Sequence, residues 1–548
     1  AGLKFTHRPY QVDPQLKNIA EWMSARGAGV AVADFDGDGY MDIYVTSSRA
    51  GSHNALYRNR GDGTFEEVGE KLGVADINHG FNSMAALWID YDNDGYPDLY
   101  VVGMGCNHLF HNERGKRFVE VTDKAGQARG IPDATGICGS PSSVLAFDYN
   151  RDGLPDIFVS NTFIKDRRHV VDGDTHLVNP LPSKLAGGPQ SLLLRNNGDG
   201  TFTNVAKELG VAVDAWAVAA GAADVNGDGW PDLFVANDAS PDRLFINHEG
   251  KYFEDVTREA FPAQYGRVGM SAEMVDLDGD GLPEIYSTKI TARAYMTGRN
   301  ELWKNLDGRH FRNDGLSLGV ADCGWSWNAK FFDIAHRGEQ DLVVVNGLYS
   351  GDKARPYWFF FNSLRAMDNY IVTDAKMYPP MKGADLSGHE KTCVFVKTKS
   401  GNYVSVSNAV GITDTYDGRG AATIDLRNDG RLSLLVSNAS GPLLLYENVS
   451  DVSANEWIGF DLRGTRSNKA AIGARVRVTQ LVHGQEKNQY LEVFAGNGYA
   501  SQSDPRLVFG LGPRPAEITG ISIRWPDGRE QRLPGFNKNA YNIIYEPK

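Results

Sequence analysis

The sequence has no apolar run that approaches the roughly 20 residues of a membrane-spanning helix, so a transmembrane helix is excluded. Basic residues are the minority, with 56 lysines and arginines against 69 aspartates and glutamates. No basic stripe occurs along the chain, which argues against a nucleic-acid partner. Only four cysteines are present. Four cysteines are compatible with two disulfides, in three possible pairings.

Motifs that carry common catalytic chemistries are also missing. The chain has no phosphate-binding Walker loop, no dinucleotide fingerprint between a strand and a helix, and no zinc-type cluster of cysteine and histidine. Fragments such as "GSPSS" do not form a nucleophile elbow. Catalytic residues therefore stay unassigned at this level.

What the chain does have is an acidic nonapeptide, "DFDGDGYMD" from Asp34 to Asp42, and four further copies of it. Positions 1, 3, 5 and 9 always carry Asp, Asn or Glu, and position 6 is always Gly, which permits a sharp turn. Ca²⁺ takes six to eight oxygen ligands in irregular geometry, and the carbonyl of position 7 would add one. The predicted ligands are Asp34, Asp36, Asp38, Tyr40, Asp42; Asp90, Asp92, Asp94, Tyr96, Asp98; Asp148, Asn150, Asp152, Leu154, Asp156; Asp224, Asn226, Asp228, Trp230, Asp232; Asp276, Asp278, Asp280, Leu282 and Glu284.

An acidic surface turn is the alternative interpretation, but five copies on one template disfavour it. Mg²⁺ fits less well because it demands octahedral geometry, and an EF-hand would end in Glu at position 12 between helices. The sequence therefore predicts about five Ca²⁺ sites. Five Ca²⁺ ions would bring the formal net charge from −13 to −3, so the acidity is first a sign of metal binding.

Each acidic loop lies in a larger repeat. An apolar strand precedes the loop, a β-rich strand follows it, and a third strand and a Gly-containing hairpin complete four strands. Two weaker copies, at 333–341 and 425–433, lack middle ligands, and there we expect strands without a well-occupied metal site. Seven repeats that bury their faces against each other predict an all-β, seven-bladed β-propeller. The segment 2–7 would close the last blade, and the helix-like stretch 14–27 would lead to the first inner strand.

The propeller is predicted to span residues 1–450, with long insertions at 161–190 and 347–391. Its repeats resemble the FG-GAP/VCBS repeats of integrin α-subunits and secreted bacterial proteins. Residues 451–548 resemble the ASPIC/UnbV domain, through "NEWIGFDLRGTRSNKAAIGARVRV", "GNGYASQSDPRLVFGLG" and "IRWPDGREQ". The combination resembles a bacterial-type member of the cartilage acidic protein family. That resemblance implies a calcium-bound propeller, export, and a role in binding or adhesion.

The final domain itself is predicted to be a small β-sandwich of short, alternating strands. The sequence starts at Ala1 without Met, as if a signal peptide had been removed, and we expect a secreted, periplasmic or cell-surface protein. Cys106 and Cys138 belong to adjacent repeats, and Cys323 and Cys393 both belong to the sixth. We predict these two disulfides, with buried free thiols as the alternative.

Propeller topology places the acidic loops on one face and the two insertions on the other. The mouth opposite the loops should collect residues that suit a polar ligand such as a sugar. These residues are His79, Asp238, Arg267, Lys289, Trp325, Trp327, Tyr416, Asp417 and Arg419. The structural alternatives are that Arg419 anchors the ring by hydrogen bonds and that Trp325 and Trp327 pack between blades.

Three functions remain open from the sequence. The first is an exported recognition or adhesion protein that binds a glycan or an extracellular protein through the face opposite calcium. The second is a carbohydrate- or metabolite-active enzyme (a lyase, dehydratase or hydrolase) with its site in the central funnel, since a fold does not fix a function. The third is a structural subunit of an extracellular assembly.

Overall fold

The computed structural model describes residues 1–12, 14–132, 136, 138–162, 190–212, 215–238, 240–262, 268–292, 296–361 and 378–548. It is an all-β protein with a few short helices, as the sequence predicts. In the residues 14–27, expected to be helical, η1 (Pro14–Ile19) and α1 (Ala20–Met23) form. No helix among the described residues is long and apolar enough to cross a membrane.

Seven sheets follow one another in the described part of the chain, and within each the strands that follow in sequence pair in antiparallel fashion. The first three comprise β1 (Val30–Ala33), β2 (Asp42–Val45), β3 (Ala55–Asn59) and β4 (Phe65–Glu67); β5 (Asn82–Ile89), β6 (Asp98–Met104), β7 (His108–Asn112) and β8 (Phe118–Glu120); β9 (Pro141–Phe147), β10 (Asp156–Asn161), β11 (Leu192–Asn196) and β12 (Phe202–Asn204). The next two comprise β13 (Trp216–Ala223), β14 (Asp232–Asp238), β15 (Arg243–His248) and β16 (Tyr252–Asp255); β17 (Ser271–Val275), β18 (Glu284–Thr288), β21 (Glu301–Asn305) and β22 (Phe311–Asn313). The last two comprise β23 (Ser326–Phe332), β24 (Asp341–Asn346), β27 (Cys393–Lys397) and β28 (Tyr403–Ser405); β29 (Gly418–Asp425), β30 (Leu432–Asn438) and β31 (Leu443–Tyr446).

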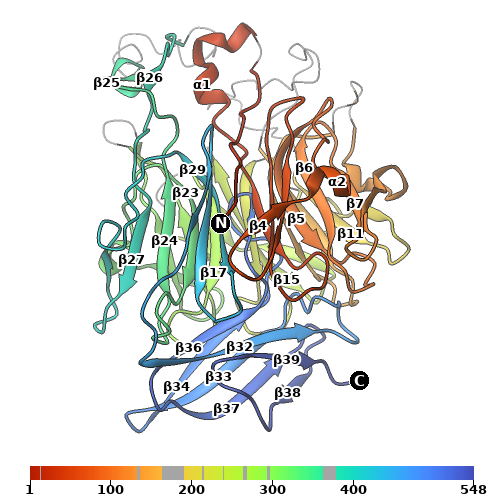
Figure 1. The fold of residues 1–548 in the computed structure, drawn as a ribbon, viewed down its shortest axis with the longest axis vertical. Coiled ribbons are helices and arrows are strands. Elements are labelled where there is room, and N and C mark those ends of the chain that lie inside the picture. The colour runs from red at the N-terminus through yellow and green to blue at the C-terminus, as the bar shows by residue number, and fades with distance from the viewer. Residues whose placement is uncertain are drawn as a thin grey trace.

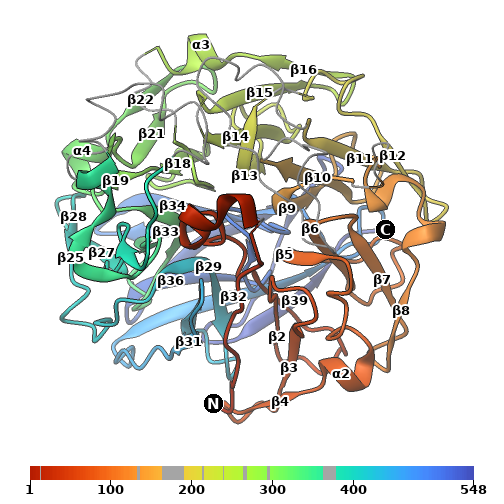
Figure 2. The same cartoon turned by 90° about the horizontal axis from the view of Figure 1, so that it is seen from above.

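These sheets stand side by side around a common centre (Figure 2). The first strands contact each other in chain order, β1 to β5, β9, β13, β17, β23 and β29, and β29 contacts β1 again. Each inner strand is therefore covered on both faces, which is why strands such as β5 and β13 read as nearly continuous apolar runs. The short outer strands are less buried: in β4, Phe65 is buried and the two residues after it are exposed.

The N-terminal residues lie along the last of these sheets. Thr6 pairs with Pro442 in antiparallel fashion, and the backbone N–H of Leu443 donates to the carbonyl of Phe5 at 3.0 Å. Short helical turns join neighbouring sheets: α2 (Gly69–Leu72), η2 (Thr122–Lys124), η3 (Gln127–Arg129), α3 (Thr257–Ala260) and α4 (Gly315–Leu318).

The C-terminal residues form two further sheets below the ring (Figure 1). One contains β36 (Leu507–Pro513), β32 (Asn455–Arg463) and β39 (Tyr541–Tyr545), and the other contains β34 (Gln485–Glu492), β33 (Arg475–Val482), β37 (Glu517–Arg524) and β38 (Glu530–Arg532). One apolar core joins the two sheets, with Phe460 and Phe509 from the first and Val476 and Ile523 from the second.

A segment of this C-terminal part, residues 493–504, reaches into the middle of the ring, and we call it the central segment. Its β35 (Ser501–Gln502) pairs in parallel with β1. Ala495 bridges to Ala146 of β9, and Gly498 bridges to Ala220 of β13. The sequence did not predict that the ring would be filled in this way.

Of the two insertions, the first lies almost wholly outside the described residues. In the second, β25 (Asp352–Pro356) pairs with β26 (Ala384–Asp385). Tyr357, Trp358 and Phe361 are buried, and the Trp358 ring lies 5.1 Å from that of Trp22 in α1. The apolar residues of this insertion thus hold it against the N-terminal helical segment.

Both predicted disulfides are confirmed. Cys106 is bonded to Cys138, and Cys323 is bonded to Cys393. The alternative of buried free thiols is wrong, because the protein has four cysteines and all four are paired.

Candidate functional site

The five acidic loops connect the first and second strands of the first five sheets, at the end of the ring that faces the C-terminal domain (Figure 1). Within each loop, the first-position carboxylate accepts a hydrogen bond from the N–H of the position-6 glycine. In the first loop, Gly39 donates to Asp34 at 2.9 Å, and in the fifth, Gly281 donates to Asp276 at 2.8 Å. These glycines have φ angles of +89° and +94°, a region that side chains with a Cβ disfavour.

The ninth-position carboxylate is held equally firmly. In the second loop, Asp98 is fully buried and accepts from the backbone N–H groups of Tyr91 and Asn112 at 3.3 and 2.7 Å. Burial raises the pKa of Asp98 to about 9 and that of Asp90 to about 7, and the neighbouring loop carboxylates add to both shifts. Carboxylates held together in this way favour a cation beside them.

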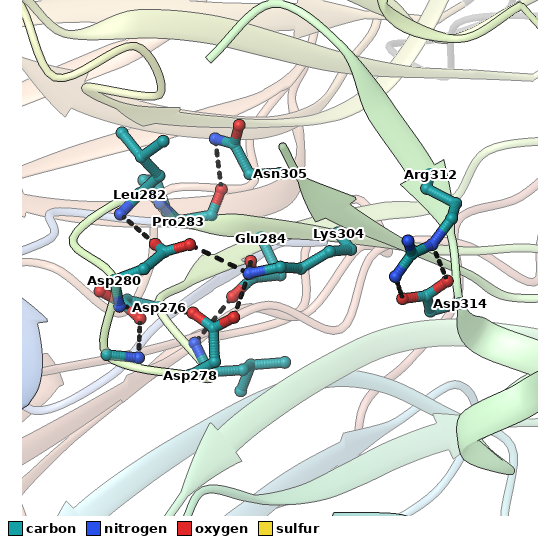
Figure 3. Close-up of polar contacts among 12 residues, drawn as sticks. Asp276, Asp278, Asp280, Leu282, Pro283, Glu284, Lys304, Asn305, Arg312 and Asp314 are labelled. Atoms are coloured by element: carbon teal, nitrogen blue, oxygen red, sulfur yellow. Dashed lines mark hydrogen bonds and ion pairs between the residues drawn. The ribbon is translucent and has the colours of Figure 1, made fainter. Parts of the chain in front are cut away.

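Carboxylate oxygens converge in three loops. In each of the sets Asp34–Asp36–Asp42, Asp90–Asp92–Asp94 and Asp276–Asp278–Glu284, one oxygen per residue lies within 4.8 Å of the others. Figure 3 shows this convergence for the fifth loop. Such acidic clusters could hold a metal ion.

The oxygen ligands of the fourth loop also fit a hard divalent cation. Asp224 is only 3% exposed, and its Oδ1 has no hydrogen-bond partner among the described residues. A buried carboxylate oxygen left unpaired costs free energy unless a ligand satisfies it. Carboxylate, amide and carbonyl oxygens are the ligands that Ca²⁺ prefers.

The third strand of each sheet places a different residue over its loop. Arg58 pairs with Asp36 at 2.5 Å. His111 lies 3.3 Å from Asp92 and 3.1 Å from Asp98. The equivalent residues are Arg195 in the third sheet, the apolar Ile246 in the fourth and Lys304 in the fifth. The loops therefore share a backbone but differ in the charge that covers them.

The sequence analysis missed a residue that lies at or close to the end of each third strand. Asn112 is fully buried, and its side-chain N–H donates to the carbonyl of Phe35 in the preceding sheet's loop at 2.8 Å. The same bond joins each sheet to the one before it. The donors and acceptors are Asn196 to Tyr91, Asn247 to Tyr149, Asn305 to Val225, Lys397 to Leu277, Asn448 to Ile334 and Asn59 to Leu426.

These seven bonds form a closed cycle of links between neighbouring sheets at the loop end of the ring. The signal in the sequence was the Asn that ends "NALYRN", "NHLFHN", "SLLLRN", "DRLFIN" and "ELWKN". Because each acceptor carbonyl belongs to the second residue of an acidic loop, the links also fix the loops.

The two degenerate loops keep the same backbone hydrogen bond, but basic side chains of the protein pair with their aspartates. Gly338 donates to Asp333 at 2.6 Å, and Gly430 donates to Asp425 at 2.7 Å. Arg337, at a middle position, pairs with Asp341. Asp425 also accepts from the Tyr541 hydroxyl of the C-terminal domain at 2.8 Å.

The C-terminal domain docks on the loop face through such contacts. Arg524 pairs with Asp224 of the fourth loop at 2.7 Å. Arg475 donates to the Gly281 carbonyl at 2.7 Å and lies 3.4 Å from Asp276 of the fifth loop. Lys469 donates its backbone N–H to Asn93 of the second loop at 2.9 Å. The face that carries the acidic loops is therefore partly covered.

Of the residues predicted at the opposite mouth, three come together below the surface. Arg419 is fully buried and donates to the carbonyls of Ala25, Gly347 and Leu348 at 2.7–2.9 Å. Its guanidinium lies 4.2 Å from the centre of the Trp327 ring, which is 1% exposed. Asp417 accepts from the backbone N–H of Ser350 at 2.8 Å.

The other predicted residues are dispersed. Lys289 is fully buried and pairs with Asp242 and Glu301, and Trp325 is 5% exposed. Asp238 is half-buried, 3.8 Å from Arg26. His79 and Tyr416 are exposed, and His79 pairs with Asp76 at 2.9 Å. Arg267 lies outside the described residues.

An open cleft of about 410 Å³ lies on this side of the ring, between the N-terminal residues and the second insertion. Its walls include Tyr10, Gln11, Glu21, Arg49, Tyr349 and Asp417. Beneath Trp325, Glu390 accepts from the Trp325 backbone N–H at 2.7 Å, and burial raises the pKa of Glu390 to about 8. Of the predicted mouth residues that the structure describes, only Asp417 reaches the cleft wall.

Comparison with known families agrees with the repeat structure. FG-GAP-like repeats are matched at residues 34–101, 90–159, 185–235 and 224–287, and the ASPIC and UnbV family is matched at residues 464–548. The chain therefore contains FG-GAP-like repeats and, after them, an ASPIC/UnbV domain.

The similar curated proteins include cartilage acidic protein 1. The Xenopus tropicalis protein is 23% identical over 529 residues, which cover 91% of this chain and 61% of that protein. The Mus musculus protein is 24% identical over 528 residues, covering 91% of this chain and 70% of that protein. This chain thus spans between three fifths and three quarters of their length. Integrin alpha-7 of Homo sapiens is 26% identical over 215 residues, covering 37% of this chain and 16% of that protein.

Solved structures give only a general likeness. An Agrocybe aegerita lectin that recognises non-reducing terminal N-acetylglucosamine has a TM-score of 0.38 and 17% identity, covering 69% of this chain and 79% of that one. BBS1N in complex with ARL6DN has a TM-score of 0.42 and 11% identity, covering 81% of this chain and 98% of that one. Likeness at this level assigns no function.

Proposed function

We propose that this protein is an exported, calcium-binding, seven-bladed β-propeller with a C-terminal β-sandwich, which recognises a glycan or an extracellular protein through the face opposite the acidic loops. One observation carries the proposal. The C-terminal domain partly covers the loop face (Figure 1), and its central segment fills the ring, while the described residues form a cleft on the opposite face. The FG-GAP-like repeats and the similarity to integrin alpha-7 favour recognition or adhesion.

Calcium would be held by the oxygen ligands of the five loops predicted above. When bound, the ion would neutralise the converging carboxylates and rigidify the loop end of each blade. The role is structural, because the loops face the C-terminal domain and not the cleft. The two degenerate loops need no ion, since Arg337, Arg506 and Tyr541 already satisfy their aspartates.

The cleft has the chemistry of a site for a polar ligand. It combines aromatic rings with a carboxylate, an amide and a guanidinium, from Tyr10, Tyr349, Glu21, Gln11 and Arg49. Such mixtures of apolar walls and a few polar groups are typical of small-ligand sites. The exposed rings of Phe359 and Phe360, at 58% and 55%, lie in the insertion that borders this cleft and would extend the contact surface.

A test of recognition is a glycan-array screen with calcium-loaded protein, followed by the variants Arg49→Ala and Tyr349→Ala. Both substitutions alter the cleft wall and should weaken binding at least about tenfold, because a lost contact of 1.4 kcal/mol has that effect. Arg60→Ala, an exposed arginine on the hairpin of the first sheet, is the control. Equal binding by all three variants would remove the cleft from the proposal.

The same samples distinguish an enzyme from a protein that only binds its ligand. Mass spectrometry of the ligand after incubation would show a product of changed mass if the protein is catalytic, and an unaltered ligand if it only binds. A site in the central funnel is disfavoured, because Arg419 and Trp327 are buried there and the central segment packs on them.

Export is supported by the two disulfides, which persist in oxidising compartments. Extracellular calcium is plentiful enough to fill loops of modest affinity. Fractionation of the source cells would test the location directly: a protein found only in a reducing cytosol would contradict it.

A further inference from the structure

The fifth acidic loop differs from the others in how its third strand covers it. Lys304 of β21 directs its ammonium group into the loop, as Figure 3 shows. The ammonium contacts the carboxylates of Asp278, Asp280 and Glu284, at 3.1 Å for the latter two. Three of the four carboxylates expected to bind the metal therefore share one lysine.

Among the described residues, no other acidic loop has one side chain that contacts three of its carboxylates, although His111 contacts two in the second loop. In the first loop, Arg58 contacts one carboxylate, and in the fourth, the equivalent residue is Ile246, which carries no charge. Lys304 is mostly covered, with a side chain 22% exposed, and the carboxylates hold the pKa of its ammonium well above the ordinary value.

From this geometry, and resting on the proposal that the loops bind Ca²⁺, we propose that Lys304 is a tethered cation that competes with Ca²⁺ for the loop Asp276–Glu284. The loop then exchanges between a lysine-held state and a calcium-held state. It fills at a higher calcium concentration than it would without the lysine.

The competition follows from the ligands. Ca²⁺ takes carboxylate oxygens at 2.3–2.6 Å, so it needs the oxygens that the ammonium now contacts. Two cations on the same oxygens repel each other, and the repulsion is strong in a partly covered site. Lysine has a flexible four-carbon stem, which lets the ammonium withdraw to solvent when the ion enters.

A second cation strengthens the effect. Arg475 of the C-terminal domain lies 3.4 Å from the remaining carboxylate, Asp276. The loop's four carboxylates thus face two basic side chains, and calcium affinity falls as the net negative charge of a site falls. Of these two cations, only Lys304 belongs to the same sheet as the loop, so its removal leaves the domain contact in place.

The lysine-held state has a structural use. Gly279 of this loop packs against the Asn488 carbonyl of β34 so closely that an added Cβ would lie 2.3 Å from it. Because Lys304 neutralises the loop when calcium is scarce, the loop keeps its shape and the C-terminal domain keeps this contact. The inference predicts a loop that stays docked at both low and high calcium.

The test compares calcium-binding isotherms of the full-length protein and three variants by equilibrium dialysis and elemental analysis. In Lys304→Met, one site should gain about tenfold or more in affinity, and the others should be unchanged. Lys304→Arg should keep the low affinity. Lys71 is an exposed lysine on α2, so Lys71→Met removes the same charge at a different place. The calcium-binding isotherm of this variant should match that of the unchanged protein.

A second readout follows the lysine itself. The rate of acylation of Lys304, measured by peptide mass spectrometry, should rise as calcium fills this site and releases the amine. Superimposable isotherms for Lys304→Met and the unchanged protein, with calcium bound by both, would overturn the inference alone. So would an acylation rate that calcium does not alter. If no variant binds calcium at millimolar concentration, the proposed calcium function itself fails.

Discussion

The central segment provides the sharpest test of how the two parts of the chain are joined. Tyr499 lies at its tip and is fully buried in the ring. Its hydroxyl accepts a hydrogen bond from the Gly27 backbone N–H at 3.1 Å, and its ring packs edge-on against Trp327 with 5.0 Å between centroids. The Tyr499 carbonyl also accepts from the Asn328 side chain at 2.9 Å.

Two substitutions separate the contributions of Tyr499. Tyr499→Phe keeps the ring but leaves the buried N–H of Gly27 unpaired, which costs about 1–3 kcal/mol of the free energy of unfolding. Tyr499→Ala also removes the ring from a closely packed site. Large-to-small replacement of a buried aromatic costs about 3–5 kcal/mol, so the alanine variant should lose more than the phenylalanine variant.

The assay is urea unfolding followed by tryptophan fluorescence, because Trp327 reports on the ring beside the tyrosine. The matched control is Tyr545→Ala, which changes a tyrosine that is 65% exposed in the same domain, and it should cost less than about 0.5 kcal/mol. If Tyr499→Ala cost no more than this control, the central segment would not hold the ring, and the reasoning would be refuted.

Four further predictions follow from other contacts. Asn112→Ala should cost about 1–3 kcal/mol in urea unfolding, because it removes the bond to the preceding sheet and leaves the Gly115 N–H, which donates to Asn112, unpaired. Glu390 has a folded-state pKa of about 8 against an ordinary 4.5, so the folded state holds a proton that the unfolded state releases. Stability should therefore fall by roughly 3–5 kcal/mol as pH rises from about 4.5 through 8, and less in Glu390→Gln. Serine at both Cys323 and Cys393 should cost about 4 kcal/mol, since that disulfide closes a sequence separation of 70 residues. Asp92→Ala should remove one bound Ca²⁺ and part of the Tm gained in millimolar calcium, measured by calorimetry with and without chelator.

Each of these has a result that would contradict it, and for the double serine variant that result is an unchanged free energy of unfolding. An unchanged urea midpoint for the Asn112 variant would mean that the cycle of links between sheets adds no stability. A flat stability between pH 5 and 8 would mean that Glu390 ionises freely in the folded protein. An equal Tm gain with calcium in the Asp92 variant would remove the second loop from the set of metal sites.

The sequence by itself determined the parts that depend on local pattern. The acidic nonapeptide with Gly at position 6 predicts its own turn, because neighbouring residues supply both the donors and the acceptors, as between Gly39 and Asp34. Alternating apolar strands between such turns predicted the all-β repeats. The cysteine pairing could be predicted because each pair belongs to one sheet or to two neighbouring sheets.

Part of the candidate site could not be predicted, because it depends on distant parts of the chain. The bond from Asn112 to Phe35 spans 77 residues, although a repeated Asn pointed to it. Strand topology predicts that the nine mouth residues lie at one end of the ring. It does not determine how deeply each side chain is buried. Arg419 and Trp327 are buried by Ala25, Leu348 and the central segment, which the repeat pattern does not describe.

Only the tertiary structure decided how the two domains fit together. Tyr499 is 472 residues from Gly27, and Arg475 is 199 residues from Asp276. No local pattern encodes such contacts, because they arise from the fit of two surfaces that are far apart in the sequence. The sequence thus determined the all-β repeats and their acidic loops, which local hydrogen bonds and strand alternation specify. Packing over long separations decided which face is covered, what fills the ring, and that Lys304 lies within the fifth loop.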